Sequence, residues 1–202
     1  MTQPSGPAPV PSLDVASFYA GSVEVLAEVE AQTDRGAAIV GVALLDQKLR
    51  LAIEAAFDPS FSAADRKRLF ATTAPLGPFH AKVMLGRALG LYGDDMARDF
   101  DLLHRIRNRF AHRLWIRDFT HPEVASICEQ LAGTQVQEVG RDGSLTPALV
   151  YRGPSDARAA FTLTMSMAIH FLYIVLAERG FATRPGGHAP TTATEPASER
   201  PS

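Results

Sequence analysis

The chain has 202 residues, a formal net charge of −2, and 46% hydrophobic and 21% charged residues. These values are typical of one soluble globular domain. The small net charge excludes a general electrostatic attraction to nucleic acid or to a membrane surface, so any such attraction would have to be local. The single cysteine, Cys128, excludes an internal disulfide and a cysteine-rich zinc site, and it suits a reducing compartment.

Two terminal segments, residues 1–12 and 183–202, are rich in Pro, Ser, Thr and Ala and show no apolar periodicity. We expect both to be disordered tails. The first of them lacks the basic start and the apolar core of a secretion signal, so we expect a cytoplasmic protein. Residues 13–182, between the tails, are expected to form a single domain.

Apolar residues repeat at helical spacing through most of this domain, which predicts an all-α fold, a compact bundle of about six to seven helices. Hydroxyl side chains mark three of the helix starts, namely Ser62, Thr120 (with Glu123 in a capping box) and Ser155. The expected helices, in chain order, span residues 13–31, 34–57, 62–70, 79–90, 94–114, 122–131 and 155–180.

Two local features add detail to this prediction. Gly36 and Gly41 lie inside the second expected helix, where each lowers helix propensity by about 1 kcal/mol. We expect them to let a neighbouring backbone or a bulky side chain approach closely. Farther along, weak alternation around Asp142-Gly143 allows a small β-hairpin within residues 134–152, with strands at 136–139 and 148–151.

The last expected helix has to be compared with a membrane span, because residues 159–177 contain no Asp, Glu, Lys or Arg. Thr162, Ser166, His170 and Tyr173 nevertheless recur at helical spacing and form one polar stripe. A lipid-bathed helix has no reason to keep such a stripe, whereas a core helix beside a polar pocket does. We therefore expect a buried helix of a soluble bundle and no membrane contact.

The most distinctive segment is Ile106-Arg107-Asn108-Arg109-Phe110-Ala111-His112, on the helix expected at 94–114. Asn108 and His112 lie four residues apart, so they share the polar face of this helix. Positions five apart are separated by about 140° around a helix axis, so Arg107 and His112 cannot share a face of a regular helix. The two would meet only through a bend in the helix or through a second subunit.

One interpretation of this segment is metal-independent cleavage of RNA. A neutral imidazole at His112 would take the proton from a 2′-hydroxyl, while Arg107 would bind the phosphate through its forked guanidinium. Neighbouring arginines would contact the nucleic-acid backbone, namely Arg105, Arg109 and Arg113. This chemistry needs no metal or other cofactor, and we expect none. Because Arg107 and His112 must meet, this interpretation also implies a homodimer.

The alternative interpretation of the same segment is structural. A buried arginine needs a partner, and the second helix offers Asp34 and Asp46 to Arg107. Such a clasp would hold two or three helices in register. His104, on the same helix, is expected to be solvated. For His112 the catalytic and structural interpretations both remain open.

Several separated groups of residues carry a family resemblance. They are Asp34-Arg35-Gly36-Ala37-Ala38, Leu44-Leu45-Asp46, Pro75-Leu76-Gly77-Pro78-Phe79 with Ala81-Lys82, Leu89-Gly90-Leu91, and Ile106 to His112. In this order, and over residues 13–179, they resemble the mannitol operon repressor family. The resemblance implies an all-helical bacterial protein that represses transcription of a sugar-alcohol uptake operon. It also implies action through a protein partner rather than direct DNA binding, because no helix-turn-helix is recognisable.

Arg107, Asn108 and His112 also resemble the Arg-x4-His motif of the HEPN superfamily, whose helical nucleotide-binding domains include many dimeric ribonucleases and toxins. This resemblance implies that Arg107 binds or polarises the phosphate, that Asn108 positions it, and that His112 serves as acid and base. The basic Arg109 stands where the repressor family is expected to have an acidic residue, which favours an RNA or phosphate ligand. We therefore expect a regulator of the mannitol-repressor type that works as a homodimer through protein contacts, with an endoribonuclease and a non-catalytic helical scaffold as alternatives.

Overall fold

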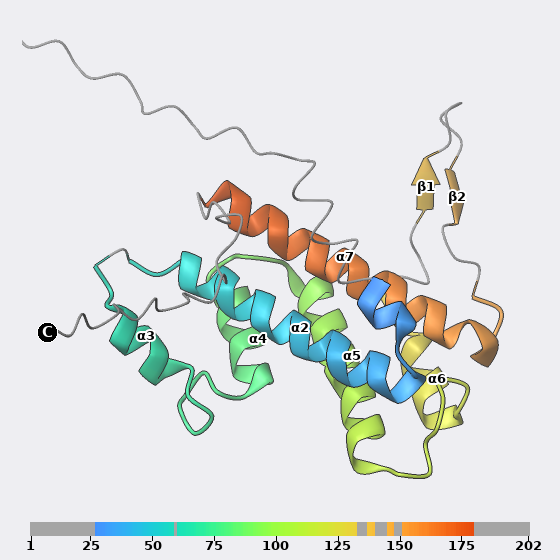
Figure 1. Ribbon diagram of the computed structural model, residues 1–202. Helices are drawn as coiled ribbons and strands as arrows, with labels where there is room; N and C mark the ends of the chain where they lie inside the picture. The colour runs from blue at the N-terminus through green and yellow to red at the C-terminus, as the bar shows by residue number, and fades with distance from the viewer. Residues whose placement is uncertain (1–26, 59, 133–136, 140–144, 148–150, 180–202) are drawn as a thin grey trace, which may run out of the picture.

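The computed structural model describes residues 27–58, 60–132, 137–139, 145–147 and 151–179, which form an all-α bundle as predicted (Figure 1). The helices are α2 (Asp34–Ala55), α3 (Ala63–Leu69), α4 (Phe79–Ala88), α5 (Asp94–His112), α6 (Pro122–Cys128) and α7 (Ala157–Glu178); a 3-10 turn, η2 (Pro154–Asp156), precedes α7, and residues 27–31 are also helical. The expected tails and most of the first expected helix lie outside the described residues.

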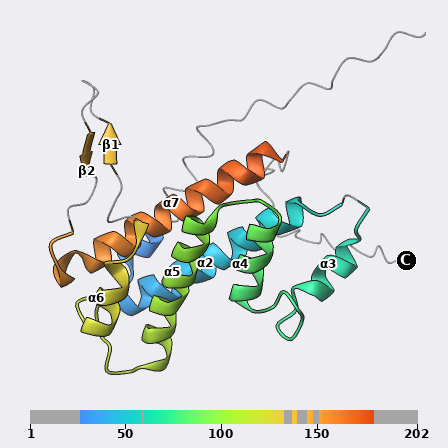
Figure 2. The ribbon, with the colours of Figure 1, turned by 180° about the vertical axis from the view of Figure 1, so that it is seen from behind.

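The bundle is organised around α2 and α7, which have 22 residues each and pack against one another. Helix α2 also contacts α4 and α5, and α6 lies against α5 and α7, while α3 lies at the end of the bundle away from α6 (Figures 1 and 2). The core between them contains four fully buried phenylalanines, Phe100, Phe110, Phe119 and Phe161. The ring of Phe119 lies 5.0 Å from those of Phe110 and Phe161, so it joins α5 to α7 through aromatic contacts.

Helix α7 is long and apolar enough to cross a membrane by length and composition, with a window of mean hydropathy 1.8. In the structure, 56% of that window is buried inside the bundle. A Cβ atom added at Gly41 on α2 would lie 3.4 Å from the Met165 methyl group of α7, so this glycine allows the close approach that we predicted for it. Helix α7 thus packs as a core helix of the bundle.

Helix α5 ends at His112, two residues before the predicted end at 114. The physical reason is a residue distant in sequence. The guanidinium of Arg35, in the first turn of α2, donates hydrogen bonds to the carbonyls of Arg113, Leu114 and Ile116, at 3.3, 3.4 and 2.7 Å. Arg113 has extended backbone angles, with φ −126° and ψ 97°, and the chain leaves the helix there.

The capping box predicted from Thr120 and Glu123 is wrong. Both the amide and the hydroxyl of Thr120 donate to the carboxylate of Asp118, at 3.0 and 2.5 Å. The residue that caps α6 is His121, whose Nδ1 accepts a hydrogen bond from the Glu123 amide at 3.4 Å. Helix α6 also ends at Cys128 rather than near residue 131. Asp118 forms a local turn that competes with the predicted cap.

Of the other two predicted helix caps, the one at Ser62 is confirmed and the one at Ser155 is wrong. Ser62 does cap α3, because its hydroxyl accepts the amide hydrogen of Asp65 at 3.1 Å. Ser155 lies in η2, and α7 begins after Asp156 without a side-chain cap. The carboxylate of Asp156 accepts the Arg152 amide instead, at 2.7 Å, which closes the turn before the helix.

The expected hairpin is present between α6 and α7 as strands β1 (Gln137–Val139) and β2 (Leu145–Pro147). They pair in antiparallel register with Gln137 opposite Pro147. The second strand thus includes residues before the predicted 148–151, of which residues 148–150 lie outside the described part of the chain. The hairpin leaves the all-α class of the domain unchanged.

Candidate functional site

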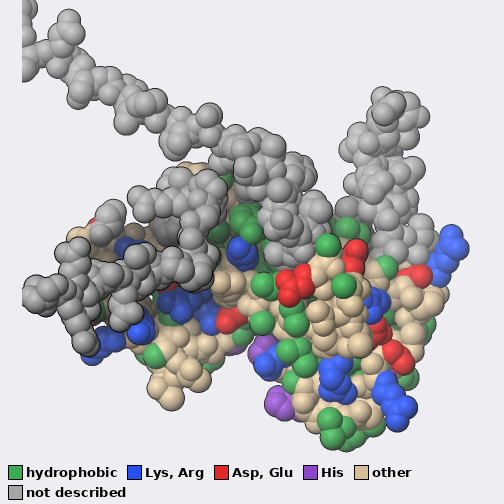
Figure 3. All heavy atoms as spheres, in the orientation of Figure 1, with side chains coloured by type: hydrophobic (Ala, Val, Ile, Leu, Met, Phe, Trp, Pro, Cys, Tyr) green, Lys and Arg blue, Asp and Glu red, His purple; other side chains and the backbone are tan. Residues whose placement is uncertain are grey.

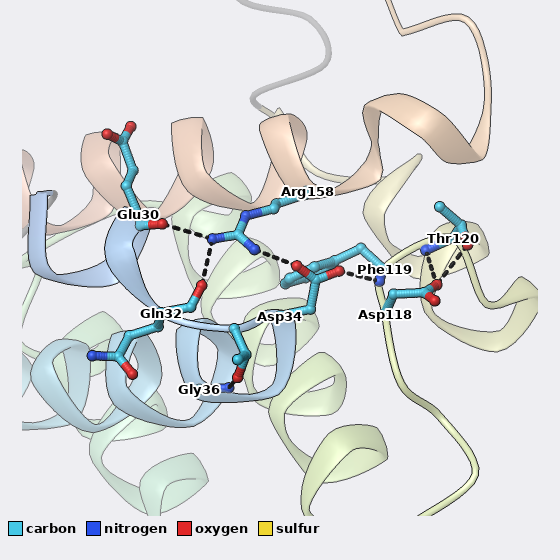
Figure 4. Close-up of polar contacts among 9 residues, drawn as sticks. Glu30, Gln32, Asp34, Gly36, Asp118, Phe119, Thr120 and Arg158 are labelled. Atoms are coloured by element: carbon cyan, nitrogen blue, oxygen red, sulfur yellow. Dashed lines mark hydrogen bonds and ion pairs between the residues drawn. The ribbon is translucent and has the colours of Figure 1, made fainter.

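Asp34, the first residue of α2, lies at a polar junction between α2, α7 and the segment after α5 (Figure 4). Its carboxylate pairs with Arg158 of α7 and accepts the Phe119 amide hydrogen at 2.9 Å. The Arg158 guanidinium also donates to the carbonyls of Glu30 and Gln32, at 2.9 and 2.8 Å. Asp34 thus forms a structural clasp, and its partner is Arg158 rather than the expected Arg107.

Asp46, the second expected partner of Arg107, pairs instead with Lys82 of α4. The Lys82 Nζ lies 2.7 Å from Oδ1 of Asp46 and donates to Oδ2 at 2.9 Å and to the Gly77 carbonyl at 3.2 Å. Only 5% of the Lys82 side chain is exposed, so its charge needs the carboxylate. The sequence analysis named Lys82 only as part of the family resemblance and did not predict that it pairs with Asp46. Its signal was the spacing, because Lys82 lies between Phe79 and Gly86, which are both buried on the same helix.

Arg107 is half-buried, and its Nη1 donates a hydrogen bond to the side-chain oxygen of the neighbouring Asn108 at 3.0 Å. No carboxylate of the described residues forms an ion pair with Arg107. His112 is exposed at the last turn of α5, and no contact within the described part of the chain joins it to Arg107. The structure joins Arg107 to Asn108, and no hydrogen bond or ion pair within the described residues joins His112 to either of them.

A group of side chains that the sequence analysis did not predict as a site lies where α4 meets α5. His80, in the first turn of α4, has its Nδ1 3.2 Å from the carboxylate of Asp101. The ring of His104 stacks on that of Phe79, with centroids 4.9 Å apart. Figure 3 shows how His, Lys, Arg and acidic side chains are interspersed with apolar ones on one face of the bundle.

His104, which we expected to be solvated, is half-buried. Burial lowers its pKa, and the nearby positive charge of Arg107 lowers it further. The carboxylates of Asp101 and Asp46 act in the opposite direction, and His80 adds to the lowering. The imidazole of His104 is therefore neutral at pH 7, and it lies within electrostatic reach of both Arg107 and His80.

A second surface begins where α5 ends. Leu114 and Trp115 are 84% and 65% exposed, although both are large and apolar. The three hydrogen bonds from Arg35 hold the backbone of this loop in place. The Arg113 guanidinium lies over the Trp115 ring, 5.8 Å from its centroid.

The three arginines expected to contact nucleic acid differ in their surroundings. Glu123 of α6 pairs with Arg113 and lies 3.5 Å from Arg109, so one carboxylate partly neutralises both. Arg105 is exposed. This side of α5 is therefore less positive than its sequence indicates.

No protein-family model and no curated protein matches this chain. A chain of one solved structure does, the X-ray structure of the MtlR–HPr complex from Escherichia coli. It is 21% identical, with a TM-score of 0.59 over 76% of this chain and 99% of that chain. The two share a fold. The match extends over nearly all of the solved chain, so the likeness concerns the whole bundle rather than a fragment of it.

We expect Asp34→Ala to lower the free energy of unfolding by about 2–4 kcal/mol, because it leaves Arg158 and the Phe119 amide without their partner. Urea denaturation followed by circular dichroism measures this change. Asp94→Ala is the matched control: Asp94 also starts a helix and pairs with an arginine, but its side chain is 77% exposed. The control should lose less than about 1 kcal/mol. Equal losses in the two variants would contradict the assignment of the clasp.

The lowered pKa of His104 predicts a dependence of stability on pH. Between its folded pKa and the ordinary value of 6.5, the unfolded chain binds more protons than the folded one. The stability is therefore complete above pH 6.5 and falls as the pH drops through the folded pKa. Histidine titration by NMR and urea denaturation at several pH values test this. His104→Gln should remove that part of the pH dependence, whereas His112→Gln, at an exposed position, should retain it.

Proposed function

We propose that this protein is a cytoplasmic regulator of transcription of the mannitol-repressor type that acts by binding another protein. The sequence resemblance and the fold shared with a chain of the MtlR–HPr complex both support this proposal. HPr is accordingly the first partner to test. The observation that carries the proposal is the exposed Leu114–Trp115 pair on a loop held by Arg35.

An exposed tryptophan beside arginines has the composition of a protein-binding surface. Tryptophan and arginine are enriched among the few interface residues that contribute most of the binding free energy. Such residues contribute most when the partner protein excludes water from them. Leu114 extends the apolar area next to Trp115. Because Arg35 already fixes the loop backbone, binding a partner would cost less conformational entropy than ordering a free loop.

The chain contains one tryptophan, so Trp115 is a built-in probe of this surface. We expect the fluorescence of Trp115 to shift to shorter wavelength when HPr covers its ring. The HPr used should be a variant without tryptophan, so that the signal comes from Trp115 alone. Trp115→Ala should weaken binding at least about tenfold in calorimetry, as substitutions at dominant interface residues do. Met84→Ala is the control, because Met84 is 51% exposed on α4, away from the loop. If Trp115→Ala and Met84→Ala bind HPr equally well, the loop is not the binding surface.

A second candidate is metal-independent cleavage of RNA by Arg107, Asn108 and His112. It is favoured by the half-buried Arg107, which no carboxylate of the described residues neutralises, and by the exposure of His112. Because these two side chains lie apart on one chain, the reaction requires a homodimer in which one copy supplies Arg107 and the other His112. Without either activity, the protein would be a non-catalytic helical scaffold.

For this candidate, we expect RNA to be cut in the presence of EDTA, and His112→Ala to abolish cutting while leaving the melting temperature unchanged. Arg107→Ala alone should also be inactive. An equal mixture of the two variants should recover about a quarter of the wild-type activity, because half of the random dimers contain one complete site of two. Cutting that persists in His112→Ala would remove the ribonuclease from consideration.

A further inference from the structure

We propose that residues 13–26 continue the helical turn at residues 27–31 and pack on the side of α2 and α7 that faces away from α4 and α5. Residues 27–31 already lie on this side (Figures 1 and 2). Val29, at their centre, is 1% exposed. The Arg158 guanidinium holds this turn at the start of α7 through the carbonyls of Glu30 and Gln32. The chain before residue 27 therefore starts from a fixed position on the bundle.

Helices α2 and α7 run parallel, and contacts along their length fix their register. The Asp34 clasp joins their first turns. Gly41 faces Met165 farther along, and about two turns later the ammonium of Lys48 lies 4.5 Å from the centroid of the Tyr173 ring. These contacts are spaced almost equally on the two helices. A straight helix laid on both of them can therefore follow them from the clasp to Tyr173.

Half-buried side chains of both helices form this surface. On α7 they are the polar stripe from Thr162 to Tyr173, which begins one turn after Arg158. Arg158 binds the chain before α2 at one end of the stripe, and Tyr173 meets Lys48 of α2 at the other, so the stripe faces the side on which residues 27–31 lie. The half-buried residues of α2 on this side, four positions apart, are Val40, Leu44 and Lys48. A surface that is polar along one helix and largely apolar along the other suits an amphipathic helix.

The sequence before residue 27 has the spacing that this surface requires. The side chains on one face of a helix over this segment are Leu26, Ser22, Phe18 and Val15. The polar stripe of α7 has the same intervals between its four members. Residues 32 and 33 form the whole connection to α2, and so short a connection joins antiparallel helices. Since Glu30 lies at Arg158 and every helix rises about 1.5 Å per residue, the four side chains come level with the four members of the stripe.

Charge also favours this segment as the occupant of the surface. Residues 13–26 contain acidic residues, Asp14 among them, and no Lys or Arg. Within the described residues, the contact of Lys48 is with the Tyr173 ring rather than with a carboxylate. In this register Asp14 lies within one residue of the level of Tyr173, and therefore beside Lys48. The segment is also attached to the surface, so it competes with a second copy of the chain at a high effective concentration.

The register is tested in the full chain with pairs of cysteines. Ser22→Cys together with Ser166→Cys places two small side chains at the same level, so mild oxidation should join them by a disulfide within one chain. Ser22→Cys with Ser126→Cys is the matched control, because Ser126 is exposed on α6. We expect the first pair to form the disulfide at least about tenfold faster, measured by gel electrophoresis without reductant and by mass spectrometry. Burial raises the pKa of the native Cys128 thiol to about 12, so it should not react.

A second variant tests the apolar contact without cysteine chemistry. In this register Phe18 reaches Leu44 of α2, so Phe18→Asp should lower the melting temperature of the full chain by about 5 °C or more. Val10→Asp, at an apolar residue of the segment that we expect to be a tail, should leave it unchanged. Equal melting temperatures of these two variants would overturn the proposal, and so would equal yields of the two disulfides. A disulfide that joins two chains would also overturn it, because a second copy would then cover the surface.

Discussion

The junction at Asp34 is the contact on which the arrangement of this molecule depends. The Asp34 carboxylate, at the start of α2, pairs with Arg158 of α7 and accepts a hydrogen bond from the amide of Phe119. Arg158 also donates hydrogen bonds to two backbone carbonyls of the segment before α2. A carboxylate and a guanidinium that are both partly removed from water need each other, and each also uses its remaining hydrogen-bonding capacity on backbone groups. Three segments distant in the sequence therefore meet at one place.

Arg35, the residue after Asp34, determines the position of the exposed loop that follows α5. Arg35 occupies the carbonyls that follow α5, so the helix ends at His112 and the loop turns outward. Phe119, at the far end of this loop, is anchored in the core between Phe110 and Phe161. Leu114 and Trp115 lie between the two anchors, and for that reason they remain exposed on a backbone that is held in place.

The side chains on two sides of helix α5 have different electrostatic surroundings, because a different helix packs against each side. On one side, Glu123 of α6 draws Arg109 and Arg113 into ion pairs beside the exposed loop. On the other, α4 brings His80 and Phe79 against Asp101 and His104, and the positive charge of Arg107 lowers the pKa of His104. The side chains from Ile106 to His112, which in the sequence look like one motif, therefore have different surroundings in the structure.

The sequence by itself determined the all-α class and the positions of the described helices, because apolar periodicity follows directly from helix geometry. It also determined that Arg107 and His112 lie on different faces, which is a consequence of their spacing. Only the tertiary structure decided which charges pair. Asp34 selects Arg158, and Asp46 selects Lys82, since each pair is made by helices whose packing depends on the whole core. The end of α5 was decided in the same way, by hydrogen bonds from Arg35, a side chain distant in the sequence that local patterns cannot locate.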